Sequence, residues 1–129
     1  MALPAKLQND LRQFQRLQQD LTVVDQQRQQ IDLKLRETAH TLEELQALPD
    51  DAVIYRSVGT LLVKAKGKAE VAETLGEEKE TLEVRLKAFE RQVNHLKERY
   101  QTMQQELSQA LKNAGIAEIE VPEGAGPSE

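Results

Sequence analysis

Two stretches of the chain place apolar residues at every seventh position, and this pattern limits the fold more than any other feature. In the first stretch nine of twelve core positions are apolar; its two series are Leu7, Phe14, Leu21, Arg28, Leu35, Leu42 and Asp10, Leu17, Val24, Ile31, Thr38, Leu45. In the second stretch eleven of twelve are apolar; its series are Ala72, Lys79, Leu86, Val93, Tyr100, Leu107 and Leu75, Leu82, Phe89, Leu96, Met103, Ala110. Six successive heptads in each stretch predict coiled-coil helices, because a lone helix would leave its apolar stripe in water.

The two stretches match in length. Leu3 to Ala47 and Ala69 to Asn113 each span 45 residues, or about 68 Å of helix. Equal lengths around a short connection predict an antiparallel two-helix hairpin. We expect a register in which Leu42 faces Leu75 and Leu7 faces Ala110, so that the polar core residues Thr38 and Lys79 meet. A slip by seven residues remains an alternative.

The start of the second helix is ambiguous. Gly76 interrupts the pattern, and glycine in a helix costs about 1 kcal/mol relative to alanine. Thr74 followed by Glu77 also fits a capping box. The helix is therefore expected to begin either near Ala69 or near Thr74.

The connection between the helices predicts a β-hairpin. Pro49 ends the first helix, because it biases the residue before it away from helical geometry. Residues 53–58 and 61–66 are short runs rich in β-branched side chains. Gly59-Thr60 between them fits a two-residue turn with glycine at its first central position.

This hairpin is expected to assemble chains. A lone two-stranded hairpin is only marginally stable in water, and its edges are open to pairing. Its apolar residues lie on both faces: Val53, Ile54, Tyr55, Val58, Leu61, Leu62 and Val63. We therefore predict a mainly α protein, an antiparallel coiled-coil hairpin whose β-hairpins from several chains join into an oligomeric β-barrel body. The alternative is a hairpin folded back onto its own helices. The predicted parts are a helix at 1–47, linker and hairpin at 48–67, a helix at 68–114 and an acidic tail at 115–129.

Composition excludes several classes of protein. Mean hydropathy is −0.61 and no run of about 18 apolar residues exists, so no membrane span is expected. No signal peptide is expected either. The chain has no cysteine, which fits cytoplasmic residence. Its last fifteen residues carry four Glu and no basic residue, which leaves a nearly neutral body. A nucleic-acid partner would usually require a basic face.

The sequence contains no motif that predicts a catalytic site. His40 and His95 both fall on outward heptad positions and lie too far apart to share a metal ion. No phosphate loop and no nucleophile motif is present. We expect no enzyme, no cofactor and no metal. The basic residues Arg56, Lys64, Lys66 and Lys68 near the hairpin are interpreted as edge protection or a solvated rim.

The helix ends farthest from the hairpin are the predicted binding site. Leu11 and Leu111 lie beside the core stripe and widen it there. A two-helix end is not expected to bury a widened stripe, and exposed apolar patches mark interaction sites. The candidate client-binding residues are Leu3, Leu7, Leu11, Leu107, Leu111, Ile116 and Ile119. The alternative is that these residues merely complete the coiled coil.

Two segments resemble a known family. The stretch LPDDAVIYRSVGTLLV (48–63) is similar to the linker and hairpin of prefoldin, in particular the archaeal β-type subunit, and ETLEVRL (80–86) is similar to its second helix. The resemblance extends to about Ala114. It implies an ATP-independent holdase, a hetero-hexamer of two α-type and four β-type subunits. Such a holdase captures unfolded polypeptides at the coiled-coil tips and passes them to a group II chaperonin.

The acidic tail is a candidate chaperonin contact under this reading, through Glu118, Glu120 and Glu123. Such a contact would weaken with salt, and the alternative is that the charges only keep the tips in solution. Two other functions stay open: a structural coiled-coil scaffold or adaptor, and a GrpE-like nucleotide-exchange factor.

Overall fold

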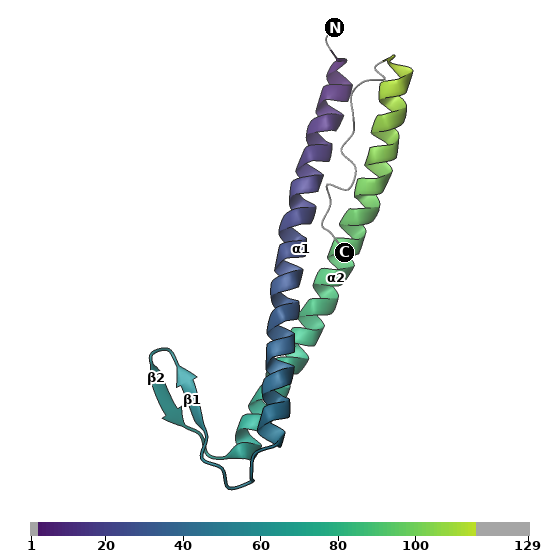
Figure 1. The fold of residues 1–129 in the computed structure, drawn as a ribbon. Helices are drawn as coiled ribbons and strands as arrows, with labels where there is room; N and C mark the ends of the chain where they lie inside the picture. Colours follow the sequence, from purple (N-terminus) through teal and green to yellow (C-terminus); the bar gives the residue numbers. More distant parts are fainter. Residues whose placement is uncertain (1–2, 116–129) are drawn as a thin grey trace. The chain divides into compact units, whose positions relative to one another are not determined.

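The computed structural model describes residues 3–115, which form two long helices joined by a β-hairpin (Figure 1). The elements in chain order are helix α1 (Ala5–Gln46), strand β1 (Tyr55–Val58), strand β2 (Leu61–Lys64) and helix α2 (Lys68–Asn113). The predicted order of helix, hairpin and helix is confirmed. Both strands are two residues shorter than expected.

The chain divides into two compact units, and both long helices contribute to each. The first unit combines Met1–Arg28 with Ala88–Glu129, and the second is Gln29–Lys87. The heptad phase holds in both units, because every one of the twenty-four predicted core positions is buried or half-buried. The period of the apolar residues therefore identified the packed face of each helix.

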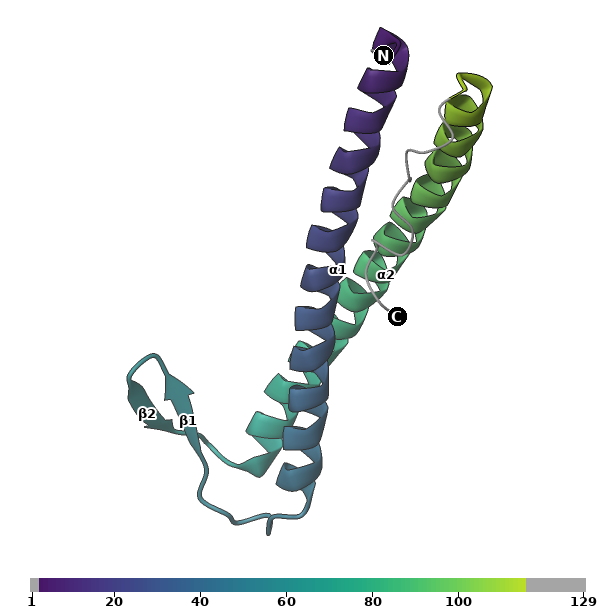
Figure 2. The ribbon, with the colours of Figure 1, turned by 45° about the horizontal axis from the view of Figure 1, so that its top comes forward.

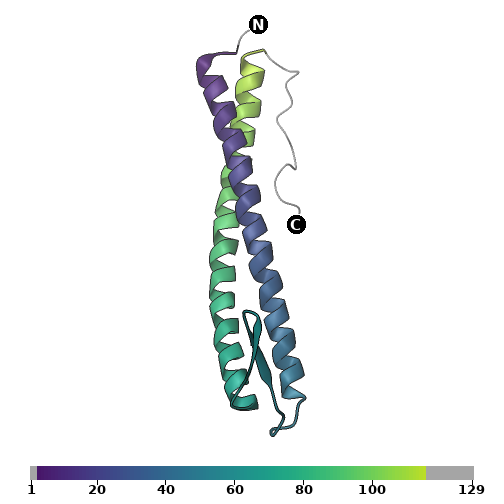
Figure 3. The ribbon, with the colours of Figure 1, turned by 90° about the vertical axis from the view of Figure 1, so that its left-hand side faces the viewer.

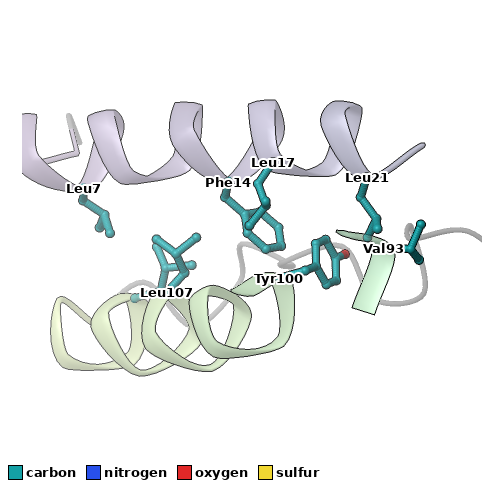
Figure 4. Packing of buried hydrophobic residues seen from close by; sticks show 8 residues of the cluster. Leu7, Phe14, Leu17, Leu21, Val93, Tyr100 and Leu107 are labelled. Carbon is teal, nitrogen blue, oxygen red and sulfur yellow. The ribbon is translucent and has the colours of Figure 1, made fainter. Parts of the chain in front are cut away.

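The core of the first unit is centred on two aromatic rings. Phe14 and Tyr100 stack with their centroids 4.8 Å apart and their planes at 28°. Figure 4 shows these rings between the helices, with Leu21 beside Val93. The fully buried members of this cluster are Leu7, Phe14, Leu17, Leu21, Val93, Tyr100, Leu107 and Leu111. Stacked aromatic pairs contribute about 0.5–1.5 kcal/mol beyond the area that they bury.

The ring contact joins two neighbouring layers of the expected register. That register places Phe14 opposite Met103 and Leu17 opposite Tyr100, and the rings of Phe14 and Tyr100 stack across these two layers. The register itself stays a prediction. The two rings are large enough to meet across one helical turn, and Met103 packs against the same cluster.

The second unit contains the hairpin and the helix ends that it connects. The pairs in its two-stranded sheet are Tyr55↔Lys64, Arg56↔Val63, Ser57↔Leu62 and Val58↔Leu61. Gly59 has φ +59°, and no described residue other than glycine has a positive φ. This combination is typical of a type II′ turn, which suits the right-handed twist of the strands. The predicted turn at Gly59-Thr60 is confirmed.

Helix α2 begins at Lys68, close to the first of the two expected starts. The amide of Val71 donates to the carbonyl of Gly67 at 3.3 Å, which closes the first helical turn. Gly76 lies within the helix, so Thr74 is not its cap. At the other end, Gly115 has φ +76° and its amide donates to the carbonyl of Lys112. This is the usual way in which glycine terminates a helix.

Gly76→Ala is expected to raise the free energy of unfolding by about 1 kcal/mol, because alanine is the better helix former. A Cβ at this position would meet no atom within 4 Å. The check is urea denaturation followed by circular dichroism. The matched control is Gly59→Ala, which is expected to lower stability because its φ of +59° strains an L side chain. Equal stability of the two variants would contradict the placement of Gly76 inside a helix and of Gly59 in a turn with positive φ.

Candidate functional site

The hairpin presents apolar side chains to solvent on both of its faces. All eight strand residues are exposed. Six apolar residues of the hairpin region are between 47% and 74% exposed: Val53, Tyr55, Val58, Leu61, Leu62 and Val63. Cross-strand pairing places Val58 and Leu61 on one face and Leu62 on the other. Only Ile54 of the predicted assembly residues is half-buried.

The hairpin stands beside the helix ends of its own unit (Figures 1 and 2). The turned view in Figure 3 shows the strands alongside these helix ends. A groove lies between them, and its apolar lining comes from Leu45, Leu48, Ile54, Val71 and Leu75. Tyr55 and Ser57 border the same groove and yet remain exposed. The fold-back alternative is therefore wrong, because the helices leave all eight strand residues in water.

The helix ends far from the hairpin are closed. Leu7, Leu107 and Leu111 are only 6%, 3% and 2% exposed, while Leu3 and Leu11 are half-buried against the same cluster. The expectation of an exposed stripe at these positions is corrected. The leucines of each helix fill the space left by the other, so the widened stripe is shared between them. Ile116, Ile119, Glu118, Glu120 and Glu123 lie outside the described residues.

Two features escaped the sequence pattern. Asp25 is only 3% exposed, although it lies one position outside the predicted stripe. Its Oδ1 accepts a hydrogen bond of 2.8 Å from Nε of Arg28, and a buried carboxylate requires such a partner. The apolar residues Val23, Leu33 and Val84 lie on the outer faces of the helices. The sequence held one signal for the ion pair of Asp25, namely an arginine three residues later on the same helix face.

Between residues 3 and 115, no group of three His, Asp or Glu side chains is arranged to hold a metal ion. His40 instead forms a contact of 3.1 Å with Glu44 on the same helix face. Within the same range, no helix is long and apolar enough to cross a bilayer.

These features define a class: a coiled-coil subunit with an unburied β-hairpin at the connection of its helices. A family model described as "Prefoldin subunit" matches residues 8–114. The prefoldin subunit beta of Archaeoglobus fulgidus is 45% identical over 109 residues, which cover 84% of this chain and 93% of that protein. The subunit beta of Thermococcus gammatolerans is 46% identical over 110 residues, covering 85% and 93%.

A solved structure agrees with these relatives. The crystal structure of the prefoldin beta subunit from Thermococcus strain KS-1 matches with a TM-score of 0.78 and 42% identity. The match covers 86% of this chain and 96% of that chain. The chain belongs to the prefoldin family. The predicted family and the predicted chaperone function are confirmed, and the scaffold and exchange-factor alternatives are not favoured.

Leu107→Ala is expected to lower the free energy of unfolding by about 3 kcal/mol, because it leaves a cavity where a buried leucine packed. Val84→Ala is the control on the same helix, since Val84 is 68% exposed. It should change stability by less than about 0.5 kcal/mol. Urea denaturation of both variants measures the difference. A small effect of Leu107→Ala would mean that the helix ends are open in solution.

Proposed function

We propose that this chain is the β-type subunit of an ATP-independent, hetero-oligomeric holdase. It assembles through the hairpin, together with α-type subunits, and it holds unfolded polypeptides at the opposite helix ends. The observation that carries the proposal is the distribution of apolar residues. Most of those on the helices are buried between them, whereas those of the two strands are all exposed. The similarity to the prefoldin β subunits of Archaeoglobus fulgidus and Thermococcus gammatolerans supports the same function.

Assembly through the hairpin follows from its energetics. Full burial of an exposed valine or leucine contributes about 1.5–3 kcal/mol. The valines and leucines of the hairpin are 47–74% exposed, so each would contribute about half or more of this if a neighbouring chain covered it. Both strands also have free edges that can pair with another strand. A hexamer of two α-type and four β-type subunits with a shared barrel satisfies both needs. The groove lined by Leu45, Val71 and Leu75 lies next to the strands and extends this apolar surface.

Client capture at the helix ends is compatible with their burial. Leu3 and Leu11 are half-buried, and their accessible part offers a first contact for an unfolded segment. Leu7, Leu107 and Leu111 become accessible when the terminal turns part, and helix ends open at low free-energy cost. A client then replaces contacts that the helices made with each other. Each end therefore binds weakly, and several ends in one assembly add their effects through effective concentration.

Transfer of the client to a group II chaperonin belongs to the same proposal. The carboxylates of Glu118, Glu120 and Glu123 are the candidate contacts of this chain. Attraction between them and a basic surface would weaken as salt is added.

Val58→Asp tests the assembly element. Val58 is 56% exposed on β1, and a charge buried in a shared sheet is costly. Sedimentation velocity with the α-type partner should show dissociated chains, while circular dichroism shows unchanged helix. Val84→Asp is the control, since it places the same charge on an exposed valine of α2. Intact assemblies of the Val58→Asp chain would contradict the proposed interface.

A double variant with Leu3→Ser and Leu11→Ser tests the capture site. We expect several-fold weaker suppression of client aggregation, because less apolar area remains for the client to cover. Light scattering from a denatured client diluted without nucleotide measures this effect. Leu33→Ser is the control, because Leu33 is 59% exposed on α1 but belongs to the other unit. Equal loss in both variants, or loss of assembly, would exclude a dedicated site at the helix ends.

A further inference from the structure

We propose that Lys68 is a positioning residue, which fixes the hairpin by binding the carbonyl end of α1 from the first turn of α2. This inference rests on the proposed function, in which the hairpin is the assembly element. In this proposal Lys68 restrains the hairpin before the hairpins of neighbouring subunits pair with it.

The contacts of Lys68 converge on the segment that leaves α1. Its Nζ donates hydrogen bonds to the backbone oxygens of Gln46 at 3.1 Å and of Leu48 at 2.9 Å. Oδ1 of Asp50 lies 3.6 Å away. The lysine side chain is only 16% exposed. The interpretation of Lys68 as part of a solvated rim is therefore wrong, whereas Arg56, Lys64 and Lys66 are exposed as expected.

The end of α1 offers carbonyl acceptors to such a cation. The last carbonyls of a helix have no partner within the helix and carry partial negative charge. A basic side chain in the last turn often binds them, but the last turn of α1 contains none. Pro49 follows and lacks an amide hydrogen. Lys68 supplies the missing donor from 22 residues away, and hydrogen bonds from a charged group are stronger than neutral ones.

The carbonyl contacts matter more than the carboxylate. The side chain of Asp50 is fully exposed, and ion pairs in open solvent contribute little because water and salt screen them. The carbonyls of Gln46 and Leu48 are fixed by the backbone at the point where the chain turns toward the hairpin. Binding them therefore restricts the direction of the incoming segment.

The outgoing segment is tied to the same helical turn. Oε2 of Glu70 accepts a hydrogen bond of 2.9 Å from the amide of Lys66. The amide of Ala65 donates to the carbonyl of Ile54 at 2.9 Å, which extends the ladder one step beyond the strands. Lys68 and Glu70 thus hold one connecting segment each, two residues apart in α2. Both connections of the hairpin are restrained from one place.

Such a restraint favours assembly by reducing its entropic cost. A hairpin free to swing about two flexible connections must be immobilised when neighbouring strands pair with it. A hairpin already held in place avoids this cost. We expect Lys68→Met to weaken assembly about tenfold, which corresponds to about 1.4 kcal/mol. Methionine keeps much of the apolar stem and removes the donor.

The first experiment measures the hairpin directly. The chain has no cysteine, so Ser57→Cys on β1 and Glu43→Cys on α1 accept two spin labels at exposed positions of one unit. Pulsed electron resonance, with labelled chain diluted in an excess of unlabelled chain, gives the distribution of label distances. We expect a narrow distribution with Lys68, a broad one with Lys68→Met and a narrow one again with Lys68→Arg. An unchanged distribution in Lys68→Met overturns the proposal.

The second experiment measures assembly with the α-type partner by sedimentation. Lys68→Met should weaken it about tenfold with unchanged helix content, Lys68→Arg should restore it, and Asp50→Asn should leave it unaltered. Lys87→Met is the control, since it removes an exposed lysine elsewhere on α2. If the natural chain did not assemble, only the proposed function would be overturned. The role of Lys68 would still be decided by the distances between the spin labels. Loss of helix in both lysine variants would show a general stability effect and overturn the positioning role.

Discussion

The burial of one narrow apolar stripe against another is the interaction on which the rest of this structure depends. Neither helix has a broad apolar face of its own, so each is stable only against its partner. The stacked rings of Phe14 and Tyr100 are part of this burial in the first unit. Every other feature, from the closed helix ends to the placement of the connection, requires that the two helices pair along this stripe.

The same constraint explains why the hairpin is left uncovered. Apart from the groove beside the strands, the pair of helices offers little further apolar surface, because its outer positions are mostly charged or polar. The valines and leucines of β1 and β2 therefore have no partner within the described chain that could bury them. A chain that folds by itself would be expected to avoid such a surface. An exposed apolar hairpin is expected in a protein whose other subunits bury it, as membership of the prefoldin family implies.

The helix ends of the first unit are expected to open more easily than its interior. Tight aromatic packing lies well inside the first unit, whereas the leucines at the helix ends close a stripe with fewer neighbours beyond them. Terminal turns open more easily than central ones. The connection, in contrast, is restrained by charged side chains that bind backbone groups. The end proposed to adapt to clients is thus held by apolar contacts, and the end proposed to assemble is held by directed hydrogen bonds.

The sequence by itself determined the elements of this protein and their packed faces. The heptads of Leu, Val and Ile predicted both helices, Pro49 predicted the end of the first, and Gly59 predicted the turn. These signals are local, because helical period, missing amides and positive φ act within a few residues. The tertiary structure alone decided the contact of Phe14 with Tyr100, the burial of Asp25, the closure around Leu107 and the reach of Lys68 to the end of α1. Each of these depends on side chains of the two helices filling the same space or reaching the same group, and a period along one helix carries no record of which side chain on the other helix lies opposite.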